Sequence, residues 1–363
     1  MSANIPSQQI INNDISAVIE ELGESLAVLE GKSILICGAG GFLGGYFVDT
    51  VARLNEYYFK KPCNIFCLDN FSTSVPQRLE HLYGKKYFQL IKEDVTRPLL
   101  LEQDIDFIIQ AASIASPTYY RLNPIETINS NVIGTHNLLE FAREKSVQSF
   151  LLLSSSEIYG DPDPQHIPTP ESYRGNVSCT GPRACYDESK RLSETYGISY
   201  WHVYGVPVKI VRPFNIYGPG MRLSDKRVLP DFVKSILNAE PIRIFSDGRV
   251  TRSFCYVEDA MRCIWKVFLS EYNGECFNIG NDQEEITVRK LADTIIEIVD
   301  KPISIEYIVS DDKEYLTDNP KRRCPDLTKM RSAFGYEPKV SLIKGLRRTL
   351  LWNEMALREG KNL

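Results

Sequence analysis

A tyrosine and a lysine that could share one catalytic pocket stand four positions apart, at Tyr186 and Lys190. Side chains at this spacing project from one face of an α-helix, so the phenol and the ammonium would be neighbours. A free phenol, with a pKa near 10, is a poor base at neutral pH, but a nearby ammonium favours the phenolate. The pair is therefore predicted to take a proton from an alcohol, and Lys190 could also hold a ribose. The alternative is a surface Tyr/Lys pair without a function.

A run of hydroxyl residues that ends in a carboxylate comes before this pair. It reads Ser154-Ser155-Ser156-Glu157 and lies at the end of an expected strand over residues 149–154. The spacing to Tyr186 would bring these hydroxyls into the same pocket as the phenol. The alternative is a solvated strand end with no ligand.

A glycine-rich turn after the apolar run 34–36 is predicted to bind the pyrophosphate of a dinucleotide. Its glycines would allow a tight turn, close approach of the backbone to the phosphates and close packing of the helix that follows. The amides at the start of that helix would face the phosphates. A plain strand–helix turn is the alternative. The residues expected to contact the cofactor here are Gly38, Gly41, Phe42, Leu43 and Gly44.

An acidic residue at the end of the next strand supports a dinucleotide site. Asp69 follows the apolar run 65–68, somewhat further from the glycines than the usual ~20 residues. A carboxylate at this point accepts hydrogen bonds from ribose hydroxyls and repels a 2′-phosphate. The sequence therefore predicts NAD rather than NADP as the cofactor, with Asn70 beside Asp69 in the site.

Two later loops are expected beside the two halves of the cofactor. Asp94 and Val95 follow the third strand, where the adenine half would lie. Ala111 and Ser113 follow the fourth strand, where the nicotinamide half would lie. Each signal is weak alone, but the two occur in the order that the fold requires.

The remaining pattern predicts an α/β protein with a Rossmann-type, doubly wound parallel sheet and a smaller α/β C-terminal substrate domain. We expect a helical extension over residues 1–30, an NAD-binding domain over 31–212 and a substrate region over 213–363, with segments that can cross between them. Strands are expected at 33–37, 64–68, 88–92, 107–110, 149–154 and 208–211, and helices near 43–57, 125–145 and 182–204. In the extension, the spacing of Ile15, Val18, Ile19, Leu22 and Leu26 predicts a helix that packs on the body or on a partner subunit.

Composition excludes several classes of function. The net charge of −5 leaves no broad basic surface for nucleic acid. No apolar run approaches the ~20 residues that span a membrane, and the N-terminus lacks the features of a signal peptide. The nine cysteines show no CxxC pair or zinc-like spacing, so we expect reduced thiols, no metal site and a cytoplasmic location.

Together, the glycine-rich loop, the serine-rich strand end and the Tyr-x-x-x-Lys pair resemble an extended short-chain dehydrogenase/reductase. The resemblance covers nearly all of residues 33–352. It is strongest to the UDP-glucuronate decarboxylases, also called UDP-xylose synthases. The stretches that carry it are 154–162, 181–191, 212–219, 251–254 and 322–326.

This resemblance implies roles for the residues of the pocket. Tyr186 would remove the proton of the sugar C4 hydroxyl while NAD takes the C4 hydride, and Lys190 would support it. Ser155 would hydrogen-bond the reacting oxygen. Ser156 and Glu157 would assist ring distortion and proton handling.

The same resemblance implies roles for four residues that lie further along the chain. Asn215 and Arg252 match groups that hold the nucleotide diphosphate. Arg323 matches an arginine at the substrate end of the site, and Arg227 matches one near the cofactor. For each arginine, a surface salt bridge of little energetic value is the alternative.

The chemistry implied is decarboxylation of a nucleotide-linked hexuronic acid through a 4-keto intermediate. Oxidation at C4 gives a β-keto acid, whose electrons can enter the carbonyl as carbon dioxide leaves, and the hydride then returns from NADH. One departure from the decarboxylase pattern is Asn129, which stands where a lysine is expected near the substrate.

Two other hypotheses stay open, and one further expectation concerns assembly. Sugar-nucleotide 4,6-dehydratases usually carry Asp-Glu in place of Ser156-Glu157, and C4 epimerases usually lack the glutamate, but either reaction is an alternative. A noncatalytic protein that senses a dinucleotide is a third. The resemblance also implies a homodimer formed through the expected helices 125–145 and 182–204.

Overall fold

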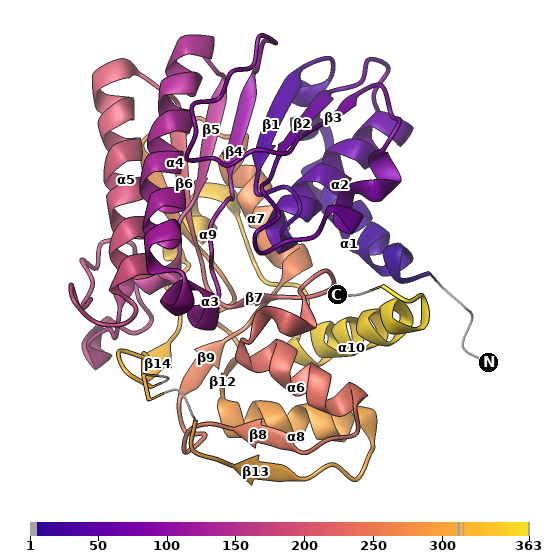
Figure 1. Cartoon of the computed structure of the whole chain (residues 1–363), viewed down its shortest axis with the longest axis vertical. Coiled ribbons are helices and arrows are strands. Elements are labelled where there is room, and N and C mark those ends of the chain that lie inside the picture. The colour runs from indigo at the N-terminus through magenta and orange to yellow at the C-terminus, as the bar shows by residue number, and fades with distance from the viewer. Residues whose placement is uncertain (1–5, 311–312, 315, 362–363) are drawn as a thin grey trace.

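A seven-stranded parallel sheet forms the centre of the computed structural model, which describes residues 6–310, 313–314 and 316–361 (Figure 1). The strand order is β11-β6-β5-β4-β1-β2-β3, and every neighbouring pair is parallel. The chain order reverses between β1 and β4, and ligands of such sheets bind at this switch point. The strands are β1 (Ser33–Cys37), β2 (Asn64–Leu68), β3 (Phe88–Ile91), β4 (Phe107–Gln110), β5 (Ser149–Leu153), β6 (Val208–Pro213) and β11 (Glu275–Ile279).

Helices cover both faces of this sheet, so the inner strands are buried on both sides and read as apolar runs. Alternate residues of a strand face opposite layers: Ile34 and Ile36 join the core under one set of helices, and Leu35 joins the core under the other. Figure 1 shows α4 and α5 side by side on one face, with α2 and α7 on the other. Their bounds are α2 (Phe42–Tyr57), α4 (Pro124–Lys145), α5 (Ala184–Tyr204) and α7 (Val257–Phe268).

The predicted fold class is confirmed, and the predicted strands and helices of this layer begin and end within two residues of the observed ones. Periodicity sufficed here because each element is long or fully buried. Two elements from beyond residue 212, β11 and α7, belong to the central sheet and its helical layer. The chain therefore returns to the sheet after it has entered the C-terminal region.

The C-terminal region lies beside the carboxyl ends of the strands and is built from small sheets and short helices (Figure 1). Strands β12, β9 and β14 form one small sheet, β13 and β8 form a second, and β10 and β7 form a third. The strands are β7 (Ile216–Tyr217), β8 (Ile242–Ile244), β9 (Thr251–Ser253), β10 (Cys255–Tyr256), β12 (Glu285–Thr287), β13 (Ile305–Tyr307) and β14 (Arg322–Arg323). The helices are α6 (Val228–Leu237), α8 (Val288–Val299), α9 (Thr328–Phe334) and α10 (Leu342–Arg358), and α3 (Pro117–Leu122) precedes α4.

The N-terminal extension forms helix α1 (Ser7–Leu22) and a 3-10 segment, Gly23–Leu29. Helix α1 lies against α7, α10 and α2 of the same chain, and the apolar side chains that predicted it are buried. No helix within the described ranges is both long and apolar enough to cross a membrane. The extension is therefore part of the body of this protein.

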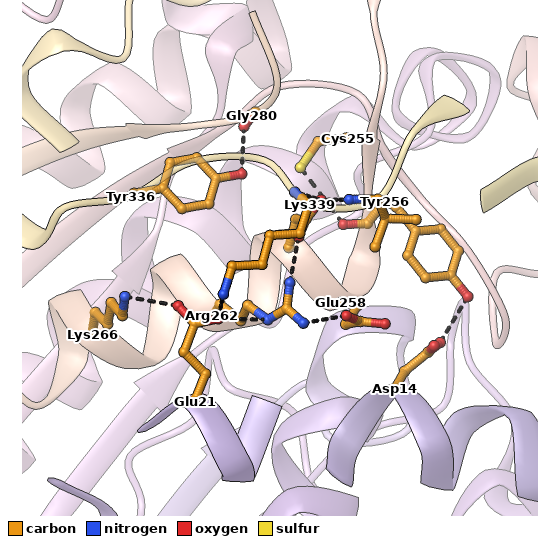
Figure 2. Close-up of polar contacts among 12 residues, drawn as sticks. Asp14, Glu21, Cys255, Tyr256, Glu258, Arg262, Lys266, Gly280, Tyr336 and Lys339 are labelled. Carbon is orange, nitrogen blue, oxygen red and sulfur yellow. Dashed lines mark hydrogen bonds and ion pairs between the residues drawn. The ribbon is translucent and has the colours of Figure 1, made fainter. Parts of the chain in front are cut away.

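Two acidic side chains of this extension fix it to the rest of the chain (Figure 2). Asp14 accepts hydrogen bonds from the Tyr256 hydroxyl at 2.8 Å and from Arg348 Nη1 at 2.9 Å. Glu21 pairs with Arg262 at 3.0 Å and with Lys266 at 2.9 Å. Both side chains reach groups more than 200 residues away, so these contacts join the N-terminal extension to the last third of the chain.

Replacement of Asp14 by asparagine should flatten the dependence of stability on pH. Burial raises the pKa of Asp14 from 3.8 to about 7, although Tyr256 and Arg348 oppose this effect. Because the folded state then holds this proton to a higher pH than the unfolded state does, the contribution of Asp14 is lost as the pH rises from about 4 to about 7. The free energy of unfolding in urea, measured from pH 4.5 to 8, should show a smaller decline for Asp14→Asn than for the wild type.

Glu24→Gln is the matched control, because Glu24 lies on the neighbouring 3-10 segment and is exposed. Its pH profile should follow that of the wild type. Parallel profiles for Asp14→Asn and the wild type would contradict the expectation.

Candidate active site

The glycine-rich turn between β1 and α2 is closed so tightly that side chains would not fit. A Cβ atom on Gly44 would lie 2.0 Å from the carbonyl oxygen of Gly38, and one on Gly38 would lie 2.8 Å from the backbone of Ala111. Gly38 also has a positive φ of 75°, which favours glycine. Helix α2 begins at Phe42 without a side-chain cap, so the amides of its first turn are free to bind an anion.

Asp69 fastens the loop after β2 to this turn. Its carboxylate accepts from the Gly40 amide at 2.8 Å, the Phe71 amide at 2.7 Å and the Ser74 hydroxyl at 2.8 Å. Asp69 is 7% exposed and is not in the lining of the cavity described below. Its contact with a ribose therefore stays a prediction, and the contacts observed are structural.

The loop after β3 also has structural contacts at the predicted residues. Asn70 Nδ2 donates to Asp94 Oδ2 at 2.7 Å, which joins the loops after β2 and β3. Burial would raise the pKa of Asp94, but hydrogen bonds from Thr96 and Asn70 hold it below its usual range. Val95 is buried under α4, where Gly134 leaves room for it.

A cavity of about 1130 Å³ lies between the carboxyl ends of the strands and the C-terminal region. Fifteen of the predicted residues line it, whereas Asp69, Asn70, Asp94, Val95 and Arg323 do not. The fifteen are Gly38, Gly41, Phe42, Leu43, Gly44, Ala111, Ser113, Ser155, Ser156, Glu157, Tyr186, Lys190, Asn215, Arg227 and Arg252. Asn129 lies in α4 and is also outside this lining, so the expected lysine position does not face the cavity.

Tyr186 and Lys190 lie one turn apart on α5, as predicted, and both are buried. Lys190 Nζ donates to the carbonyl oxygen of Leu153 at 2.8 Å and lies 5.8 Å from the centroid of the Tyr186 ring. Burial lowers the pKa of Lys190 to about 7. Burial also raises the pKa of Tyr186 to about 12, although a hydrogen bond with Ser155 and the charge of Arg227 oppose the rise.

The prediction that Lys190 favours the phenolate is therefore not tested by this structure. Burial dominates at both side chains, and it disfavours the charged form of each. Arg227 is a cation that lowers the pKa of Tyr186, and it is held by Asp225 through Nη2 at 2.9 Å. The sequence placed Arg227 near the cofactor and did not connect it with the phenol.

All four residues of the serine-rich strand end line the cavity. Ser155 Oγ accepts from the Glu157 amide at 3.2 Å and caps the 3-10 turn Ser156–Tyr159. Ser154 instead bonds Glu194, which also pairs with Arg212 at 2.6 Å. The last residue of the strand end, Glu157, is mostly buried, with 19% of its side chain exposed.

Glu157 is held by two arginines, one on each carboxylate oxygen. Arg183 Nη2 bonds Oε2, and Arg323 Nη1 bonds Oε1. Burial alone would raise the pKa of Glu157, but Arg183 and Arg323 hold it well below its usual range. Arg323 lies in β14 opposite Arg252 in β9, so Arg323 supports the carboxylate from behind the wall of the cavity.

The predicted residues Asn215 and Arg252 lie in the C-terminal wall of the cavity. Asn215 Nδ2 donates to the carbonyl oxygen of Ser253 at 3.2 Å. Arg252 Nη2 donates to Asn319 Oδ1 at 2.9 Å, and its side chain is mostly buried. Both are placed where they could hold a diphosphate, and these roles stay predictions.

Three residues of the site were missed by the sequence analysis: Arg183, Tyr120 and Asp187. Arg183 precedes Tyr186 by three positions, which is a helical spacing that could have suggested it. Tyr120 stacks on Tyr186, with ring centroids 5.0 Å apart and planes inclined by 11°. Burial and the charge of Glu157 raise the pKa of Asp187 to about 8. Tyr120 carried no sequence signal, because its position depends on how α3 packs against α5. The raised pKa of Asp187 results from burial and from Glu157, which local spacing does not reveal.

The residues present fit a dinucleotide. The glycines form a groove that any Cβ atom would fill, next to the free amides at the start of α2. The hydroxyl of Ser113 is buried at the expected nicotinamide end and has no hydrogen-bond partner within the described residues. A polar groove with an unsatisfied buried hydroxyl is the arrangement expected for a ligand site.

Comparison with known proteins agrees with this geometry. Residues 34–280 match the NAD dependent epimerase/dehydratase family. The chain is 40% identical to UDP-glucuronic acid decarboxylase 5 of Arabidopsis thaliana over 327 residues, which cover 90% of each protein. It is 36% identical to UDP-glucuronic acid decarboxylase 1 of Xenopus tropicalis, over 93% of this chain and 76% of that protein. The chain therefore belongs to the NAD dependent epimerase/dehydratase family, and NAD is its cofactor.

Solved structures show the same fold. UDP-glucose 4-epimerase of Thermotoga maritima, solved with UDP-glucose, superposes with a TM-score of 0.78 at 24% identity, over 90% of this chain and 99% of that chain. UDP-glucuronic acid 4-epimerase of Bacillus cereus, in complex with UDP-glucuronic acid and NAD, superposes with a TM-score of 0.73 at 25% identity, over 89% of this chain and 99% of that chain. Their likeness supports the assignment of the fold.

A graded pair of substitutions should test the glycine turn. A Cβ on Gly44 would overlap the Gly38 carbonyl oxygen at 2.0 Å, whereas one on Gly41 would meet the same oxygen at 3.1 Å. Gly44→Ala should therefore abolish retention of NAD and lower the free energy of unfolding by about 1–3 kcal/mol. Gly41→Ala should weaken both only slightly. Calorimetric titration with NAD and thermal unfolding would measure the two effects, and equal affinities in the two variants would contradict the expectation.

Proposed function

We propose that this protein decarboxylates UDP-glucuronate to UDP-xylose, with NAD as a cofactor that is regenerated in each turnover. The observation that carries the proposal is the pair Ser156-Glu157 beside Tyr186, with Glu157 fixed as an anion. The UDP-glucuronic acid decarboxylases support it, because they match this chain over about nine tenths of its length.

The described residues divide the work of the reaction among them. Bound NAD supplies a reversible acceptor for the C4 hydride. Tyr186 takes the proton of the C4 hydroxyl and later returns it, and Ser155 lies within reach of the same oxygen. Because burial raises the pKa of the phenol, positive charge must offset the burial, and Arg227 is placed to provide part of that charge. Asn215 and Arg252 hold the diphosphate of the substrate.

Loss of carbon dioxide follows from the oxidation at C4. The new carbonyl lies β to the carboxylate, so the electrons of the breaking bond enter it as an enolate. A proton from water at C5 and return of the hydride to C4 then give the pentose. Ser156 stands where a dehydratase carries an aspartate, and a serine is a poor acid for expulsion of the C6 hydroxyl. The site therefore favours decarboxylation over 4,6-dehydration.

Incubation of the purified protein with UDP-glucuronate should give a product that is lighter by about 44 mass units, without net formation of NADH. Tyr186→Phe should lower kcat by about 10²–10⁴-fold, because the proton of the C4 hydroxyl loses its acceptor. Mass spectrometry of the nucleotide sugars would measure both.

The other outcomes point to the alternatives. A loss of about 18 mass units would indicate a 4,6-dehydratase, and an unchanged mass with inversion at C4 would indicate an epimerase. Unchanged turnover in Tyr186→Phe would contradict the catalytic assignment and favour a noncatalytic role.

We further propose that the protein is a cytoplasmic homodimer that pairs through α4 and α5. The two helices lie side by side on one flank of the molecule (Figure 1). Several apolar side chains on their outer faces are exposed. They are Ile128, Ile133, Leu192, Val203 and Tyr204. A second copy of the same surface would cover them in a four-helix bundle, as the family resemblance implies.

Charged substitutions on this surface should weaken the dimer. Leu192→Glu and Val203→Glu would each place a carboxylate in the apolar contact, so the dissociation constant should rise at least about tenfold. Sedimentation over a range of concentrations would measure it. Leu100→Glu is the control, because Leu100 is 95% exposed outside both helices. Equal dissociation constants for all three variants would contradict this interface.

A further inference from the structure

Arg183 contacts Glu157 and the Tyr120 ring, and Tyr120 in turn stacks on Tyr186. Its guanidinium donates to Glu157 Oε2. Its Cζ lies 5.7 Å from the centroid of the Tyr120 ring, which stacks on Tyr186. Arg183 is 4% exposed, at the start of α5. One buried cation therefore joins the carboxylate to the aromatic stack.

The carboxylate keeps room for a ligand although two arginines bind it. Each carboxylate oxygen can accept more than one hydrogen bond, and Glu157 lines the cavity. Arg183 takes one oxygen from the cavity side, and Arg323 takes the other from behind. The free acceptor positions of Glu157 are therefore available to a substrate hydroxyl.

The charged and titratable groups around Glu157 keep it ionised. The net effect of Arg183 and Arg323, with Arg252 adding to it, is to hold the pKa of Glu157 well below its usual range against the effect of burial. The groups that face it are Arg183, Tyr186 and Asp187 from α5, Tyr120 from α3, Arg227 at the start of α6, Arg252 from β9 and Arg323 from β14. Asp187 and the two tyrosines all have raised pKa values, so they add little negative charge near neutral pH.

We propose that Arg183 is a positioning residue of this site: it fixes Glu157 as an anionic hydrogen-bond acceptor for the substrate and holds Tyr120 flat against Tyr186. The inference rests on the proposed function and adds a residue to it. Glu157 then orients the sugar throughout the cycle and does not donate a proton. Arg323 shares only the first of the two tasks, because it lies outside the cavity and away from the stack.

The pH profile of kcat/KM for UDP-glucuronate tests this role. Arg183→Gln should raise the pKa of Glu157. The acid limb of the profile, which is the loss of kcat/KM on acidification as Glu157 takes up a proton, should therefore move to higher pH. At neutral pH, kcat should fall by about 10²-fold because the aromatic stack and the carboxylate lose their common support. Arg183→Lys keeps the positive charge but lacks the planar guanidinium group. It should therefore return the acid limb to its wild-type position but should not restore kcat.

A double-mutant cycle separates this role from a general structural one. In a Glu157→Gln background, Arg183→Gln should not shift the acid limb further, because the group that titrates is absent. Arg289→Gln is the matched control: Arg289 is exposed and pairs with Asp293 on α8, so its removal should leave the profile unchanged.

Thermal unfolding and NAD titration would establish that each variant is folded. A folded Arg183→Gln variant with the wild-type acid limb would overturn the proposal. If that variant does not fold, Arg183→Lys decides: wild-type kcat overturns the proposal, and a reduced kcat with an intact acid limb supports it. If the wild type releases no carbon dioxide, the proposed function is wrong. The role of Arg183 would then be tested by the same pH comparison, made on whichever reaction the protein does catalyse.

Discussion

A buried carboxylate must be compensated by a nearby positive charge, and this constraint connects distant parts of the chain. Transfer of an ion out of water costs several kcal/mol. If one partner of a buried ion pair is removed, the other charge stays buried and this cost is no longer compensated. Three carboxylates are held in this way, in the pairs Asp49–Arg78, Glu157–Arg323 and Glu194–Arg212. The partners are up to 166 positions apart in the sequence. These pairs therefore constrain which segments can lie together, whatever their net contribution to stability.

The pair at Glu157 is the one that unites the fold with the site. Its carboxylate follows β5 of the central sheet, whereas Arg323 belongs to β14 of the C-terminal region. Arg183 adds a third segment, the start of α5, which also carries Tyr186. The wall of the cavity is thus complete only when the sheet, its helical layer and the C-terminal region have all assembled. A site built in this way is preorganised, because its charges are fixed before a ligand arrives.

The sequence was informative where chemistry depends on local spacing. The glycine turn and the Tyr186/Lys190 pair lie within single elements or turns, so residue types and intervals sufficed to predict them. The buried strands and the long helices were predicted for the same reason. The β14 strand of two residues has no periodicity of its own, so its register with β9, and hence the position of Arg323 behind the cavity, could not be predicted.

Electrostatics at Tyr186 shows the remaining limit of such reasoning. Helical spacing correctly placed Lys190 one turn from the phenol, and simple proximity predicted that the ammonium would favour the phenolate. The outcome depends on burial, which the spacing does not contain: Lys190 is itself desolvated, and its pKa falls to about 7. Arg227, which follows the loop after β7, adds a positive charge that lowers the pKa of the phenol. The chemistry of Tyr186 and Lys190 therefore depends on how the neighbouring elements pack around the pair, as well as on the two residues themselves.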